Sequence, residues 1–167
     1  MKNISRQKKL AHMFHHTLSE LYFIEKSYND LIKKLNDYPH KQLRKYYSSY
    51  LAARPDSISA IEVIFLSLNK KVKTHKTEKA KHLIKNTRKL MSDAPKTMYA
   101  QFMFTHAIHK VKHYQIAIYK VLITWTDMLG YTDAKSILLM LLNSKTAAVN
   151  ALDKHIYTLL SAHSGRL

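Results

Sequence analysis

Hydrophobic positions recur at helical spacing along most of the chain. Apolar side chains return every three or four residues within five segments, and short polar breaks separate these segments. We therefore predict helices over residues 5–36, 40–69, 78–91, 96–129 and about 132–161.

The first of these segments has the clearest apolar stripe. Its members are Phe14, Leu18, Leu21, Glu25, Tyr28, Ile32 and Leu35. One member of the stripe is an acid, and a carboxylate on a core-facing position is costly unless something pairs with it. Glu25 is therefore the first candidate functional residue.

Proline and glycine mark breaks in the helical pattern. Pro39 and Pro95 follow two segments, Gly130 follows a third, and Pro55 interrupts the second segment. Only two glycines and three prolines occur in 167 residues, which is too few for the turns of an all-β chain. We predict one all-α domain over residues 1–167, an antiparallel four-helix bundle with an extra short helix in the connection after the second helix. A basic extension of about residues 1–8 and a tail of about 162–167 would flank it.

Two stretches carry a family resemblance. Leu18-Ser19-Glu20-Leu21-Tyr22-Phe23-Ile24-Glu25-Lys26 is similar to the opening helix of the YciE/YciF-type ferritin-like family, and Val111-Lys112-His113-Tyr114-Gln115-Ile116-Ala117-Ile118-Tyr119 to a later one, with Trp125 following. The resemblance covers roughly residues 13–160. It implies a ferritin-like bundle, usually dimeric, with a di-metal centre between the helices and a link to stress responses.

The chain departs from that family at the metal ligands. Glu25 matches the first-helix glutamate, but neutral or basic residues stand where the other ligands are implied. The positions of this vestigial centre are Glu25, Ala53, Ser57, Lys112, Gln115, Ser144 and Ala148. Two iron ions need about four carboxylates, supplied by several helices. Between Asp93 and Asp153 the only acids are Asp127 and Asp133. We therefore expect neither a di-iron cofactor nor ferroxidase activity.

Lys112 stands where a ligand carboxylate is implied. One hypothesis is that its ammonium replaces the charge of the metal and pairs with Glu25, while Tyr28 or Gln115 adds hydrogen bonds. The alternative is that Glu25 reaches solvent or a dimer interface and that Lys112 extends outward along its aliphatic stem.

Histidine is frequent, with eleven residues, and three of them invite a metal interpretation. His106, His109 and His113 are three and four residues apart, so they share one side of a helix. No acidic or cysteine ligand is near them in sequence, and a hydrated basic face or a histidine satisfied in the core explains them more simply. They are weak candidates for a metal site.

Positive charge dominates the composition. The chain has 28 Lys and Arg against 11 Asp and Glu, for a net charge of +17. The most basic stretch contains Lys70, Lys71, Lys73, Lys76, Lys79, Lys81, Lys85, Arg88 and Lys89. Such a stretch attracts polyanions, although a solvated connection between helices has the same composition.

Three functional hypotheses remain. The first is a non-catalytic structural or interaction protein that self-associates, with a dimer favoured. The second is a binder of nucleic acid, another polyanion or an acidic protein through residues 70–89. The third is a metal-binding stress protein with an atypical site. The absence of cysteine excludes disulfides and thiolate chemistry. Because neither a signal peptide nor a membrane span is visible, we expect a cytoplasmic protein.

Overall fold

The fold was analysed in a computed structural model that describes residues 2–37, 44, 56–94 and 97–161. The described elements are helical, and there is no strand among them. They are α1 (Lys2–Lys33), the 3-10 turn η1 (Lys34–Asp37), α3 (Ser57–Ser67), α4 (Glu78–Asp93), α5 (Met98–Leu129) and α6 (Thr132–Ser161). The predicted all-α fold is confirmed, and four helices have bounds within about three residues of the prediction. Residues 2–8, expected as an extension, are part of α1. Apart from residue 44, the first half of the predicted second helix lies outside the described residues, as does the tail 162–167.

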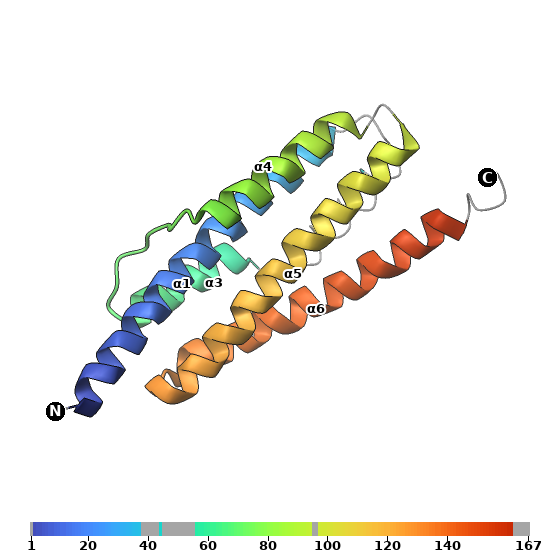
Figure 1. The fold of residues 1–167 in the computed structure, drawn as a ribbon. Helices are drawn as coiled ribbons and strands as arrows, with labels where there is room; N and C mark the ends of the chain where they lie inside the picture. The colour runs from blue at the N-terminus through green and yellow to red at the C-terminus, as the bar shows by residue number, and fades with distance from the viewer. Residues whose placement is uncertain (1, 38–43, 45–55, 95–96, 162–167) are drawn as a thin grey trace.

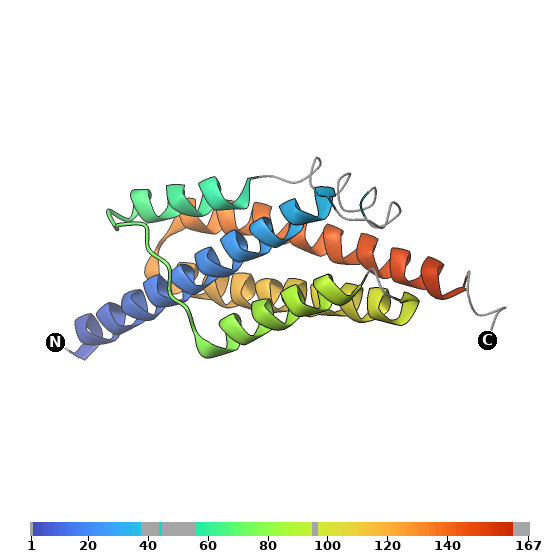
Figure 2. The same ribbon diagram turned by 90° about the horizontal axis from the view of Figure 1, so that it is seen from above.

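The helices form one elongated bundle (Figures 1 and 2). Helix α3 runs back along α1, and the chain then crosses to α4, which runs in the direction of α1. Helix α5 is antiparallel to both α4 and α6. Because α4 returns the chain to the far end of the bundle, α3 and α5 run in the same direction. Helix α4 is therefore the short crossover helix that the sequence predicts.

Local sequence fixes the helix ends. Asp56 begins α3 by accepting hydrogen bonds from the backbone N–H groups of Ile58 and Ser59. The hydroxyls of Thr77 and Thr97 cap α4 and α5 in the same way. Gly130 ends α5 in the left-handed conformation, with φ of 70°, which favours glycine. The predicted stop at Gly130 is therefore confirmed.

The core lies along the stripe that the sequence marks on α1. All seven stripe residues, six on α1 and Leu35 on η1, are at most 1% exposed. Helices α3, α5 and α6 add apolar side chains that pack against them, among which Ile61, Phe104 and Leu138 are fully buried. This burial removes large apolar areas from water and supplies most of the stabilising free energy.

None of the described helices is both long enough and apolar enough to cross a membrane.

Candidate functional site: a buried ionic centre on Glu25

Glu25 lies in the middle of the bundle with a fully buried side chain. Its Oε2 atom is 2.6 Å from the Lys145 ammonium and accepts a hydrogen bond of 2.8 Å from the Ser57 hydroxyl. Its Oε1 atom accepts a hydrogen bond of 3.0 Å from the Tyr119 hydroxyl. The carboxylate of α1 therefore joins α3, α5 and α6 at one point.

The electrostatics of this centre keep the acid ionised. Burial alone raises the pKa of Glu25, because it disfavours the charged form. The charge and hydrogen bond of Lys145, the charge of Lys112 and the hydrogen bond from Ser57 together outweigh burial, so the pKa lies below its ordinary value. Glu25 is thus a carboxylate held by cations and hydroxyls.

Lys112 belongs to the centre but does not play the predicted part. It is 1% exposed, and its ammonium lies 4.2 Å from the centre of the Tyr28 ring, where a cation is attracted to the ring face. It acts on Glu25 through its charge, whereas the direct ion pair is made by Lys145. The predicted Lys112–Glu25 pair is therefore corrected to Lys145–Glu25, and Ser57 and Tyr119 take the hydrogen-bonding parts expected of Tyr28 and Gln115.

The remaining positions of the vestigial centre differ in how deeply they are buried. Gln115 is fully buried, and neither end of its amide has a hydrogen-bond partner among the described residues. Ala148 is buried and Ser144 is half-buried, while Ala53 lies outside the described residues.

Two members of the centre, Lys145 and Tyr119, were missed in the sequence. A signal for Lys145 exists, because Leu138, Leu141, Lys145, Ala148 and Leu152 recur at spacings of three and four and all are buried. This spacing places the lysine on the apolar stripe of α6. Tyr119 follows Lys112 and Gln115 at helical spacing on α5, which is the same type of signal.

The donors around Glu25 do not fit a pair of metal ions. The group closest to the carboxylate is an ammonium, and a second ammonium lies nearby, so metal ions there would meet like charge. Within the described ranges no group of three or more His, Asp and Glu side chains is placed to hold an ion. The sequence between residues 38 and 55 contains no acid at all.

Comparison with known proteins identifies the family. The model of the family described as "Domain of unknown function (DUF892)" matches residues 9–164. The chain belongs to the DUF892 family. It is 28% identical over 133 residues to Protein YciF of Escherichia coli strain K12, an alignment that covers 78% of this chain and 80% of YciF. The predicted resemblance to the YciE/YciF type is therefore confirmed for this DUF892 chain.

Solved structures support the same conclusion about the fold. The crystal structure of the E. coli stress protein YciF matches with a TM-score of 0.80 and 25% identity, over 91% of this chain and 97% of that one. YcfI of Rhodopseudomonas palustris matches with a TM-score of 0.72 and 23% identity, over 86% of this chain and 92% of that one. The DUF892 chain therefore has the ferritin-like bundle of YciF.

Of the three candidate histidines on α5, two lie in contact with each other. The Nε2 atoms of His109 and His113 are 3.1 Å apart, and His109 Nε2 is 2.8 Å from the Asp153 carboxylate of α6. His106 is exposed. The arrangement links α5 to α6 at the surface, and the weak metal prediction gains no support from it, because these groups do not form a three-ligand site.

The crossover is fastened by a second carboxylate. Glu20 of α1 accepts hydrogen bonds of 2.6 Å from Thr77 and 2.7 Å from Tyr114, and the N–H of His75 donates to the Ser19 carbonyl at 3.0 Å. Burial, together with the bond to Glu20, raises the pKa of Tyr114 to about 12. These contacts hold the start of α4 against α1 and α5.

The nine basic residues predicted as one polyanion-binding region are divided by the fold. Lys70 and Lys73 lie close enough to His15 of α1 to lower its pKa, and Lys76 lies 5.9 Å from the centre of the Phe23 ring. The basic residues from 79 onward are on α4. The region therefore comprises a connection that lies over α1 and a separate basic helix.

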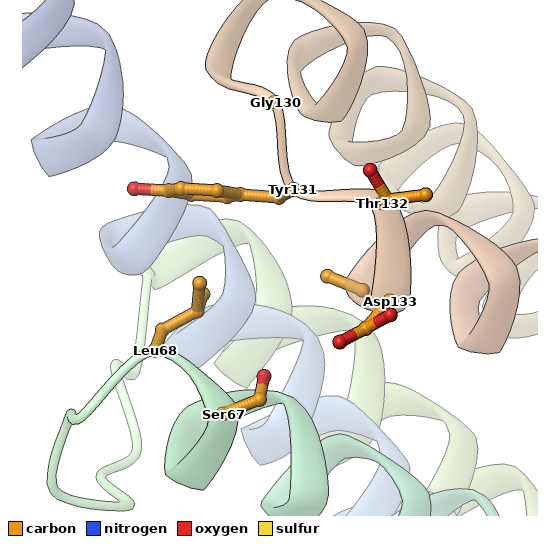
Figure 3. A pocket seen from close by; sticks show the side chains of 7 residues that line it. Ser67, Leu68, Gly130, Tyr131, Thr132 and Asp133 are labelled. Atoms are coloured by element: carbon orange, nitrogen blue, oxygen red, sulfur yellow. The ribbon is translucent and has the colours of Figure 1, made fainter.

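A pocket of about 350 Å³ lies at the end of the bundle where α3 ends and α5 turns into α6 (Figure 3). Ser67, Leu68 and residues 130–134 line it. Figure 3 shows the Tyr131 side chain extending from the turn toward α1. Ser67 is ten residues beyond Ser57, about 15 Å along α3, so this pocket is separate from the ionic centre.

The histidines beneath the crossover connection predict a pH dependence. The pKa of His15 is lowered first by burial and then by Lys70, Lys73 and His12, and that of His16 first by burial and then mainly by His75. A histidine with a pKa below its unfolded value of about 6.5 stabilises the fold above pH 6.5, and this stability is lost as the pH falls through the folded pKa. We expect the melting temperature to fall between pH 7 and pH 5.

Melting curves of His15→Gln and His16→Gln across this range check the prediction. His15→Gln, at a half-buried position, should flatten the pH dependence most, His16→Gln, at an exposed position beside His75, should flatten it less, and His106→Gln, at an exposed position of α5, should leave it unchanged. A wild-type melting temperature that stays constant over this range would contradict the prediction. The window lies above 4.5, the ordinary pKa of the Glu25 carboxyl, so this acid does not confuse the result.

Proposed function

We propose that the DUF892 chain is a metal-free, non-catalytic ferritin-like bundle that acts as a structural or interaction module. The observation that carries the proposal is the 2.6 Å ion pair between Glu25 and Lys145 at the centre of the bundle. An ammonium supplies there the positive charge that a metal ion supplies in a di-metal protein. Lys112 adds a second cation, and both hydroxyl partners of Glu25 are neutral donors.

Metal analysis tests this proposal. We expect purified protein, after incubation with excess Fe²⁺ and desalting, to retain well below one iron per chain and to oxidise Fe²⁺ no faster than buffer. About two irons per chain, lost in Glu25→Gln, would overturn the proposal. Iron that remains in Glu25→Gln would be bound at the surface and would leave the centre metal-free as proposed.

Self-association is part of the proposed role. Helices α3 and α6 pack against each other, and each also exposes large apolar side chains: Val63 and Leu66 on α3, and Leu139 and Met140 on α6. Exposed apolar groups of this kind are typical of contact surfaces between proteins. Light scattering should give the mass of two chains, and the mass of one chain at all concentrations would reject a dimer.

A further inference from the structure

The exposed side of α4 is basic and contains no large apolar side chain. Ala80, Ile84 and Thr87 face the core, and the opposite side carries exposed cations: Lys81, Lys85, Arg88 and Lys89. None of the exposed large hydrophobic residues identified in the described part of the chain belongs to α4. Lys81 pairs with Glu78, which is the only acid in the first turn. The helix therefore offers an exposed surface that is basic and polar.

A recess of about 540 Å³ continues this surface at the end of α1. Its lining residues are Asp30, Lys33, Lys34 and Arg88. All four side chains are exposed, and none makes an ion pair within 4 Å in the described part of the chain. Three cations and one carboxylate thus surround one concave site with a net charge of +2.

Three neighbouring cations attract an oxyanion. Arginine binds phosphate oxygens through its planar fork of N–H donors, and lysine binds them as a point charge. A phosphate in the recess would relieve the repulsion between Lys33, Lys34 and Arg88. From Arg88 to Lys81 the cations continue for seven residues, about 10 Å along α4. Duplex DNA presents about six charges over that length.

We propose that this basic face, defined as Lys33, Lys34, Lys81, Lys85, Arg88 and Lys89, binds the phosphate backbone of double-stranded nucleic acid, with a phosphate in the recess. The repeated cations fit a polyanion better than a single free phosphate. The lack of exposed apolar side chains on α4 argues against a membrane, because a helix that lies in a membrane surface buries an apolar face there. Contacts to phosphate without contacts to base edges are independent of sequence.

Fluorescence anisotropy with a labelled 20-base-pair duplex, between 50 and 200 mM KCl, tests the proposal. The recess variant is Lys33→Gln/Lys34→Gln/Arg88→Gln. We expect the slope of log K against log salt to decrease in magnitude by about 0.9, because the three cations together hold one phosphate in the recess. Affinity at 100 mM KCl should fall at least about tenfold.

A charge-matched variant, Lys110→Gln/Lys120→Gln/Lys154→Gln, serves as the control. It removes the same three charges from exposed positions of α5 and α6 that do not line the recess, and it should retain most of the affinity and slope. Equal losses in the two variants, or no binding by the wild type at 50 mM KCl, would overturn the proposal. Binding to vesicles of anionic lipid without binding to the duplex would overturn it as well. If melting curves show that the recess variant is unfolded, Arg88→Gln alone provides the comparison, with an expected decrease in slope of at most about 0.9.

Discussion

Lys145→Met is expected to lower the free energy of unfolding by about 3–5 kcal/mol. The substitution removes the ammonium that lies 2.6 Å from Glu25 Oε2 and leaves a fully buried carboxylate without its ion-pair partner. Methionine has nearly the volume of lysine, so the loss arises from charge rather than from a cavity. Urea titration of wild type and variant measures the difference.

A surface ion pair provides the matched control. Lys135 lies 2.5 Å from Asp127, but both side chains are at least 36% exposed. Lys135→Met should therefore cost no more than about 1 kcal/mol. The double variant Glu25→Gln/Lys145→Met removes both members of the buried pair, and its loss should be clearly smaller than the sum of the two single losses. A loss for Lys145→Met no larger than that for Lys135→Met would show that the buried pair contributes no more to the free energy of unfolding than a surface pair does.

Phe14→Ala is expected to cost about 3–5 kcal/mol, because it leaves a large cavity in the core. Phe14 is fully buried, and its ring meets that of Tyr131 edge to face, with the ring centres 5.4 Å apart. This contact fixes the first half of α1 to the turn between α5 and α6. Its removal should therefore also loosen the wall of the pocket in Figure 3.

The neighbouring residue supplies the control for this prediction. Met13 is 50% exposed, so Met13→Ala should change stability by no more than about 0.5 kcal/mol. The same urea titrations give both values, and hydrogen exchange at the backbone amide of Tyr131 reports on the turn. Losses of similar size for the two variants would mean that the face of α1 has been misassigned.

The periodicity of the sequence was sufficient to predict the helices and their inward faces. The stripe of α1 is buried throughout, because residues three and four apart share one side of a helix whatever the partner is. Glu25 was identifiable for the same reason, as an acid within that stripe. Ser57 was placed at the centre by the family resemblance, and it does bond to Glu25.

The partners across the bundle were less accessible to prediction. Lys145 is 120 residues from Glu25, and the sequence around either residue does not indicate that the two side chains are in contact. The contact depends on the rotation of α6 about its axis and on the reach of a four-carbon side chain. Lys112 was the more conspicuous candidate because of the family pattern, yet its ammonium lies against the Tyr28 ring.

The charges at the centre of the bundle also constrain how this chain can evolve. Lys145→Glu, a single step toward an acidic ligand set, changes the interior charge by two units and places two carboxylates together where an attractive pair had been. Such an intermediate should be less stable than the present chain, since it places two carboxylates together out of reach of water. A change to a carboxylate ligand set would have to pass through such sequences, so gradual substitution tends to preserve the lysine-centred interior.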